Sequence, residues 1–191
     1  MRSSELLWLL LALTLSVAAL SSVSFLADRM QRAFAFDARQ LLASDLLIVS
    51  DQPLPQAFLD RAKNQHLQLA QTIVFPSMAT VGSHSKLASL KAVSPQYPLR
   101  GALRVQSKSQ VKSFSSGPEQ GFVWVDPAML ASLHAKEGDT ISLGQKTFVI
   151  GGVLERELDR GAGFMNFAPR VMINLADLND TGLIGLGSRV T

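Results

Sequence analysis

Cysteine is absent from this sequence, and charged residues are scarce at its N-terminal end. Without cysteine the chain forms no disulfide and offers no thiol nucleophile or thiolate metal ligand, which is compatible with an oxidising compartment without proving one. Charged residues are 17% of the chain against 47% hydrophobic residues, and none lies between Leu6 and Ala27. No glycine precedes Gly82 and no proline precedes Pro53, so the N-terminal segment lacks the two strongest helix breakers.

A concentrated excess of charge is also missing. The net charge is +3 over 191 residues, and the basic residues between Lys86 and Lys112 are spaced apart and mixed with serine and glutamine. A nucleic-acid-binding domain carries a dense basic patch or stripe. We therefore expect no nucleic-acid partner, and a chain of this length is otherwise sufficient for one ordinary domain or two small ones.

The uncharged segment predicts a transmembrane helix. Leu6 to Ala27 contains 22 residues, and a helix of that length is about 33 Å long, enough to cross a hydrocarbon core of about 30 Å. Small residues recur at three- or four-residue steps, which would let a second helix approach closely: Ala12, Ser16, Ala19 and Val23. Apolar residues keep a helical period as far as Leu42, so we predict a single transmembrane and stalk helix within residues 1–42.

A cleavable signal peptide is the alternative for this segment, because Ala18 and Ala19 resemble a small-residue cleavage site. The apolar run is longer than a signal peptide needs, and the helical pattern continues past the membrane. Orientation is less clear from charge: Arg29, Arg32 and Arg39 outnumber Arg2, and the positive-inside rule alone would place the C-terminal side in the cytoplasm. A long following domain weakens that rule.

The remaining chain predicts an α+β fold, in which a mixed α/β domain of two subdomains follows the helix. Residues 43–105 read as a β-α-β subdomain with a hairpin. The buried-strand run Leu46 to Val49 comes first, then a short helix to about Asn64, a strand over 67–75, and a hairpin turning at 82–85. Residues 106–120, rich in serine, glutamine, lysine and glycine, read as an exposed loop between subdomains.

Residues 121–191 predict a second, β-rich subdomain, incomplete at its C-terminal end. A strand over 121–125 leads to Asp126, which would cap a helix with Pro127 at its first position. A hairpin follows, with strands over 140–143 and 146–154, and a further strand is expected over 171–174. The chain then stops without a cap or a turn, which we read as a cut.

The titratable residues show no catalytic or metal-binding spacing. His66, His84 and His134 are far apart in sequence, and surface positions are the simpler interpretation. Glu155, Glu157 and Asp159 alternate with arginines in a glycine-rich stretch, which predicts solvated charge. The glycines at 182, 185 and 187 have the wrong order for a dinucleotide loop, and no phosphate-binding loop occurs, so we expect no ATP site in this chain.

One segment stands out as a candidate surface for a partner or a ligand. Gly161 to Arg170 reads G-A-G-F-M-N-F-A-P-R, and its Phe164, Met165, Phe167 and Arg170 are the candidate partner-facing or ligand-facing residues. Clustered phenylalanine and methionine between glycines and a proline would form an adaptable apolar surface. The alternative, that these residues belong to the core of the sheet, is equally open.

Several strings together resemble the YbbP-type branch of the MacB/FtsX superfamily of ABC-transporter permeases. They are L-A-L-T-L-S-V-A-A-L (11–20), F-P-S-M (75–78), L-K-A-V (90–93), Y-P-L-R-G (97–101), V-W-V-D-P (123–127), G-F-M-N-F-A-P-R-V-M-I-N-L-A-D-L (163–178) and G-S-R-V (187–190). They run nearly end to end and are specific in combination. The family has a basic stretch ahead of its first helix, which here is only Arg2.

The resemblance implies the first transmembrane helix and first periplasmic domain of a permease in the bacterial inner membrane. Such permeases have no catalytic residues of their own and work by mechanotransmission, moving a periplasmic domain when a separate cytoplasmic ABC ATPase subunit hydrolyses ATP. The implied partners are that ATPase and membrane lipids, with a periplasmic esterase or a hydrophobic ligand as further candidates. The cofactor ATP would be bound by the partner subunit, and the implied task is export or extraction of lipids or hydrophobic compounds.

Two rival hypotheses remain. In the first, the chain is a periplasmic binding or adaptor domain that is either anchored by one helix or secreted. In the second it is an enzyme, which is disfavoured because the sequence shows no recognisable set of catalytic residues.

Overall fold

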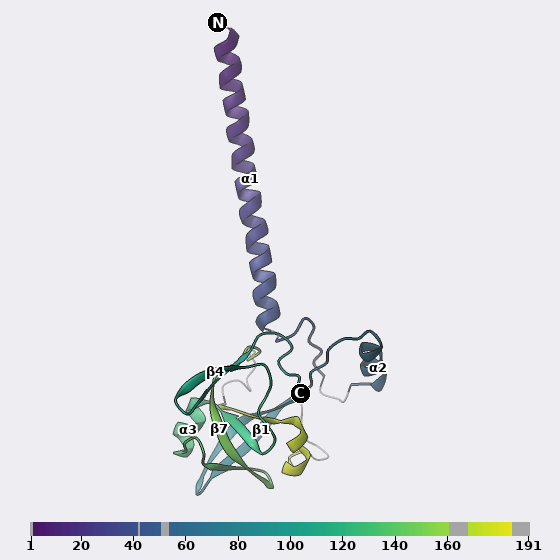
Figure 1. The fold of residues 1–191 in the computed structure, drawn as a ribbon, viewed down its shortest axis with the longest axis vertical. Coiled ribbons are helices and arrows are strands. Elements are labelled where there is room, and N and C mark those ends of the chain that lie inside the picture. The colour runs from purple at the N-terminus through teal and green to yellow at the C-terminus, as the bar shows by residue number, and fades with distance from the viewer. Residues whose placement is uncertain (1, 42, 51–53, 161–167, 185–191) are drawn as a thin grey trace. The chain divides into compact units, whose positions relative to one another are not determined.

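The structure is a computed structural model that describes residues 2–41, 43–50, 54–160 and 168–184. Within the first helix, only the backbone is described for residues 2–5 and 34–41. The chain divides into two compact units, Met1–Arg39 and Gln40–Thr191, each of which is treated by itself. The elements, drawn in Figure 1, are α1 (Arg2–Leu41), α2 (Gln56–Asn64), β1 (Thr72–Val81), β2 (His84–Val93), β3 (Leu103–Ser107), β4 (Gln110–Phe114), β5 (Phe122–Val125), α3 (Pro127–Leu133), β6 (Thr140–Leu143), β7 (Lys146–Arg156), β8 (Arg170–Asn174) and the 3-10 turns η2 (Leu175–Asp177) and η3 (Asn179–Thr181).

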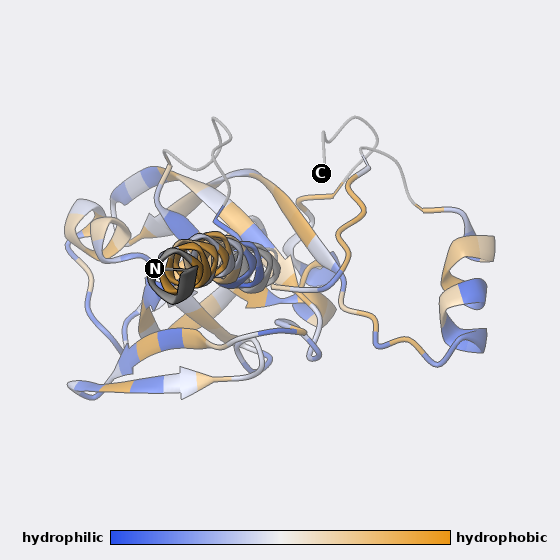
Figure 2. Cartoon of the chain, turned by 90° about the horizontal axis from the view of Figure 1, so that it is seen from above, coloured by the Kyte–Doolittle hydropathy of each residue, from blue (hydrophilic) through white to orange (hydrophobic). Residues whose placement is uncertain are grey.

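Helix α1 confirms the prediction of one uninterrupted helix. It has 40 residues, and Leu6–Ala33 within it is long and apolar enough to cross a membrane, with a mean hydropathy of 2.2. Its large apolar side chains are exposed within the structure, which agrees with a helix that crosses a membrane. Figure 2, which looks along the helix, shows this hydrophobic colouring in its N-terminal part.

The folded unit is built on a closed ring of six strands, in the order β7, β5, β8, β2, β1, β6 and back to β7. The pairs β2–β8 and β5–β7 are parallel, and the other neighbours are antiparallel. Strand β7 is long enough to pair with β6 near its start and with β3 near its end, so the β3–β4 hairpin extends from the ring. Closure leaves few unpaired strand edges in the barrel.

Side-chain alternation divides the buried residues between two cores. The first fills the inside of the barrel and is covered by α3; its largest members are Phe75, Leu90, Met129, Leu133, Ile141, Leu143, Phe148, Ile150, Ile173 and Leu178. The second lies on the opposite face of β2, β5, β7 and β8 and contains Val93, Tyr97, Leu103, Val105, Trp124, Leu154 and Met172. Because neighbouring residues of a strand face opposite sides, Val123 and Val125 belong to the first core and Trp124 to the second.

Several predicted elements are confirmed with small shifts of boundary. The β1–β2 hairpin turns at Gly82 and Ser83, and the β6–β7 hairpin turns at Gly144 and Gln145. The Asp126 side chain accepts a hydrogen bond of 3.0 Å from the Ala128 amide, which caps α3 as expected. Strand β8 also occupies its predicted position.

The strand predicted over 44–50 is wrong, and the β-α-β unit with it. Leu46, Leu47, Ile48 and Val49 form no strand and are 48–74% exposed. Helix α2 exists, but it buries none of its residues, and the strand expected from Leu67 begins only at Thr72. The physical reason is that a buried strand needs neighbours on its edges and layers on its faces, and the barrel closes without this segment.

The loop predicted over 106–120 is also wrong in part, because it contains the end of β3 and the whole of β4. These two strands turn at Lys108 and Ser109, whose φ angles of 49° and 64° are those of a tight hairpin turn. The signal was weak because β4 is a mostly exposed edge strand with polar side chains. Strands from 43–105 and from 121–191 share the barrel, and the division into two subdomains at those boundaries stays a prediction.

Candidate functional site

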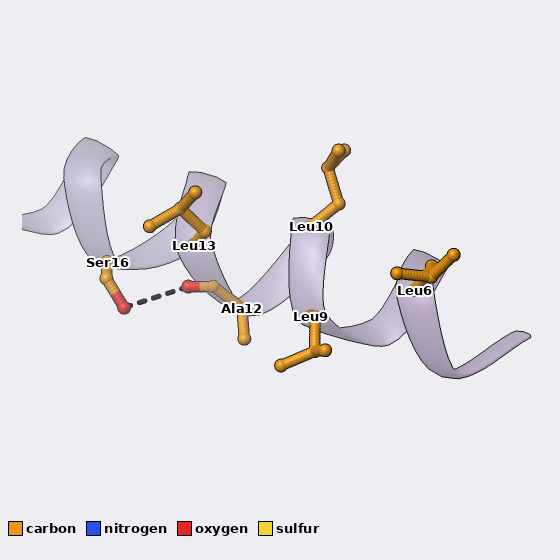
Figure 3. Close-up of a pocket in the computed structure, with 6 residues that line it drawn as sticks. All are labelled: Leu6, Leu9, Leu10, Ala12, Leu13 and Ser16. Atoms are coloured by element: carbon orange, nitrogen blue, oxygen red, sulfur yellow. Dashed lines mark hydrogen bonds between the residues drawn. The ribbon is translucent and has the colours of Figure 1, made fainter.

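The apolar part of α1 carries a shallow groove that includes two small residues. The small side chains of Ala12 and Ser16 interrupt the leucines there. The lining residues, drawn in Figure 3, are Leu6, Leu9, Leu10, Ala12, Leu13 and Ser16. The Ser16 hydroxyl donates to the Ala12 carbonyl oxygen at 2.8 Å, and Thr14 and Ser22 make the same kind of bond within the helix. The hydroxyls of Thr14, Ser16 and Ser22 are therefore satisfied within the helix and can face lipid or another helix.

A cluster of charged side chains is buried beside the second core. The Lys91 ammonium donates to Glu157 Oε1 at 2.7 Å, to Asp159 Oδ1 at 2.7 Å and to the Tyr97 hydroxyl at 2.8 Å. The Tyr97 hydroxyl in turn donates to Asp159. The Arg170 guanidinium donates to Glu157 Oε2 at 2.8 Å and to the Ser89 hydroxyl at 2.5 Å. Two cations and two carboxylates thus balance one another, which is the condition under which buried charge is tolerated.

The strand register brings these groups to one face. Ser89, Lys91 and Val93 alternate along β2, and Arg170 and Met172 alternate along the adjacent strand β8. Val93 and Met172 belong to the second core, so Lys91 and Arg170 lie on that same side. The side chains of Lys91 and Arg170 are only 2% and 3% exposed.

The solvated charge predicted at 155–159 is wrong for two of its three acidic residues. The Glu157 side chain is 1% exposed and the Asp159 side chain 15%, whereas Glu155 is partly exposed and lies 3.9 Å from Arg104. The alternation of acidic and basic residues gave no sign of this, because the partners Lys91 and Tyr97 are more than 60 residues away in the chain.

Burial has a clear electrostatic consequence at Tyr97. Desolvation and the nearby Asp159 and Glu157 carboxylates raise the pKa of the Tyr97 phenol above its ordinary value. The phenol therefore stays neutral over the physiological range and serves as a hydrogen-bond donor inside the cluster. The Lys91 ammonium also lies 4.4 Å from the centroid of its ring.

The cluster includes residues that precede the segment 161–170 and the final residue of that segment. Glu157 and Asp159 precede that segment, and Arg160 forms an ion pair of 2.7 Å with Asp126 at the cap of α3. Arg170 is its final residue. Phe164, Met165 and Phe167 lie outside the described residues, so their predicted role stays a prediction. Arg170 itself is buried among its ion-pair and hydrogen-bond partners rather than facing a partner.

The three histidines are far apart in the sequence, but two of them are neighbours in the fold. His66, His84 and His134 are all exposed, as predicted. However, the fold brings His84 and His134 together, with ring centroids 5.1 Å apart. No group of three or more metal-ligating side chains occurs in the part of the chain that the structure describes.

Comparison with known proteins covers nearly the whole chain. The family described as MacB-like periplasmic core domain matches residues 7–189. The chain is 36% identical over 190 residues to the uncharacterized ABC transporter permease YbbP of Escherichia coli (strain K12), which covers 100% of this chain but only 23% of that relative.

Solved structures give weaker likenesses. The extracellular domain of the noncanonic ABC-type transporter YknZ from Gram-positive bacteria has 15% identity and a TM-score of 0.42, covering 59% of this chain and 58% of that one. The periplasmic region of MacB from Actinobacillus actinomycetemcomitans has 16% identity and a TM-score of 0.40, covering 69% and 62%. The family match and the curated relative confirm the resemblance read from the sequence, and the chain belongs to the MacB-like periplasmic core domain family.

Proposed function

We propose that this chain is the N-terminal part of an ABC-transporter permease subunit of the mechanotransmission type, in the bacterial inner membrane, with its folded domain in the periplasm. Family membership and the name of the E. coli relative support this proposal. The observation that carries it is α1, in which a stretch able to cross a membrane, Leu6–Ala33, continues without interruption to Leu41.

The helix has the mechanical properties that such a role requires. No glycine or proline occurs between Arg2 and Leu41, so each backbone amide beyond the first turn can keep its bond to the carbonyl four residues earlier. At 1.5 Å per residue, the 40 residues span about 60 Å. A displacement at the cytoplasmic end of such a helix is carried along its axis instead of being absorbed at a hinge.

ATP hydrolysis is assigned to a separate cytoplasmic ABC ATPase subunit. The chain contains no phosphate-binding loop, and the permease part is proposed to have no catalytic residues of its own. In this arrangement the N-terminus of α1 lies in the cytoplasm, within reach of an ATPase. The arginines that follow the apolar stretch then lie on the periplasmic side, where a long folded domain follows them.

For the substrate we propose lipids or other hydrophobic compounds. Support comes from apolar side chains that the described chain leaves exposed, beginning with Leu46 to Val49. A second apolar surface is the groove on the outside of β1 and β2, where Met78 and Leu87 oppose each other and are each about half exposed. Adjacent exposed apolar side chains are typical of an interaction site.

A helix-breaking substitution tests the mechanism. Gln31→Pro lies in α1 near the end of the apolar stretch, where proline would remove one backbone bond and kink the helix. Gln31→Ala is the matched control, because Gln31 is exposed and alanine preserves the helix. The full-length permease with its ATPase would be reconstituted in proteoliposomes, and ATP-driven movement of a fluorescent phospholipid would be measured alongside ATP hydrolysis.

We expect Gln31→Pro to retain ATP hydrolysis while losing lipid movement, and Gln31→Ala to retain both. Unchanged lipid movement in Gln31→Pro would contradict the role of the helix. If no ABC ATPase co-purifies with the full-length protein, the permease assignment itself fails, and the membrane-anchored or secreted binding or adaptor domain becomes the better interpretation. Mass spectrometry of the mature N-terminus distinguishes the anchored from the secreted form, since cleavage near Ser21 would remove about half of α1.

A further inference from the structure

The C-terminal end of α3 and the start of β2 bring two histidines into contact. His84 begins β2 and His134 follows α3, yet their ring centroids are 5.1 Å apart and their planes are inclined at 72°. Both side chains are exposed, so their ring nitrogens are accessible from solution. The pair is separate from the buried ion cluster and from the apolar surfaces described above.

The backbone at His134 is left-handed, as it is at His66, which has a φ of 55°. His134 is the C-cap of α3 with a φ of 50°, in the left-handed region where helices usually end with glycine or asparagine. A residue with a side chain pays about 1 kcal/mol or more in this conformation, and such strain is concentrated at sites with a function. A glycine would form the same cap without strain, so the cap alone gives no reason for a histidine.

The ring separation agrees with shared coordination of one metal ion. With a metal–nitrogen distance of about 2.0–2.1 Å and a tetrahedral angle, two imidazoles bound to one ion have centroids about 5.2 Å apart. The observed 5.1 Å matches this separation. Neutral imidazole is a good ligand for divalent zinc, copper and nickel.

We propose that His84 and His134 bind one divalent transition-metal ion, Zn²⁺ in the test below, each through one ring nitrogen. Among the described residues no further histidine, aspartate or glutamate completes a protein-ligand set of three, so water fills the remaining positions. The ion is therefore exchangeable, unlike one in a closed structural site. Its binding ties the β1–β2 hairpin to the end of α3.

The test is a Zn²⁺ titration of the full 191-residue chain, purified in detergent with a tag free of histidine and followed by isothermal calorimetry. We expect one ion per chain with a dissociation constant in the micromolar range. Loss of a second-shell partner costs 10–100-fold in metal affinity, so loss of a ligand in His84→Ala or His134→Ala should cost at least about tenfold. His66→Ala is the matched control, because it removes the third exposed histidine and should leave the affinity unchanged.

A second variant separates metal binding from a merely structural contact. His134→Gly removes the ligand and also relieves the left-handed backbone, so the apo domain should be at least as stable as wild type while Zn²⁺ affinity falls as in His134→Ala. Saturating Zn²⁺ should raise the Tm of the wild type and of His66→Ala but not of His134→Gly. The proposal is overturned if wild type shows no Zn²⁺ binding up to 1 mM, if all variants bind alike, or if His66→Ala loses as much affinity as the other two.

Discussion

Removal of the Lys91 ammonium is the most direct test of the buried ion cluster. In Lys91→Met the chain keeps a side chain of similar length, but the cluster changes from neutral to one excess negative charge. Glu157 then retains only Arg170 as a cation, and Asp159 retains only the Tyr97 hydroxyl among the cluster's groups. Breaking a buried ion pair by removing one partner costs about 3–5 kcal/mol.

That cost is large against the total stability of a domain, which is typically about 5–15 kcal/mol. We therefore expect Lys91→Met to fold but to lose about 3–5 kcal/mol in free energy of unfolding. The assay is urea unfolding of the purified chain in mild detergent. Trp124, buried in the second core, is the fluorescent reporter, in a Trp8→Phe background that removes the only other tryptophan.

Lys86→Met is the matched control on the same strand. Lys86 is exposed, so its substitution should change the free energy of unfolding by no more than about 0.5 kcal/mol. The double variant Lys91→Met with Asp159→Asn removes the surplus charge and should be less destabilised than the sum of the two single variants, by about 0.5–3 kcal/mol. If Lys91→Met is as stable as Lys86→Met, or if the double variant is simply additive, the cluster does not act as a buried, charge-balanced unit.

Three further predictions concern single residues. The Ser77 hydroxyl is buried with no hydrogen-bond partner among the described residues, so Ser77→Ala should raise the free energy of unfolding by about 1 kcal/mol. If urea unfolding instead shows a lower free energy of unfolding for Ser77→Ala, the hydroxyl has a hydrogen-bond partner. Gly144 and Gly82 both have positive φ, but a Cβ on Gly144 would lie 2.1 Å from the Thr181 carbonyl oxygen, whereas one on Gly82 meets nothing within 4 Å. Gly144→Ala should therefore lower the free energy of unfolding by at least about 2 kcal/mol more than Gly82→Ala does. Equal losses in the two variants would contradict the close approach. Because burial raises the pKa of Tyr97 in the folded state, its contribution to stability is complete below about pH 10 and declines above it, by about 1.4 kcal/mol per pH unit. Tyr97→Phe should lack this decline, and identical slopes of unfolding free energy between pH 10 and 11 would refute the assignment.

Local patterns were sufficient for the parts of this protein that interact mainly with their own neighbours in sequence. The helix α1 follows from an apolar run without glycine or proline, and its prediction holds to within a few residues. The Asp126 cap and the two hairpin turns were likewise predictable, because capping and tight turns depend on a few consecutive residues. The family resemblance rested on strings spread along the chain, and the comparisons confirm it.

The sequence alone determined the class of this protein, which is a long apolar helix followed by a mixed α/β domain. These features depend on residues that are close together in the sequence. Only the tertiary structure decided which strands close the barrel, and it excluded Leu46 to Val49 because apolar residues form a buried strand only where neighbouring strands pair with them. It also placed Lys91 among two carboxylates and His84 beside His134. These contacts join residues 50 or more positions apart, and no local periodicity records which distant side chains a closed sheet will bring to the same face.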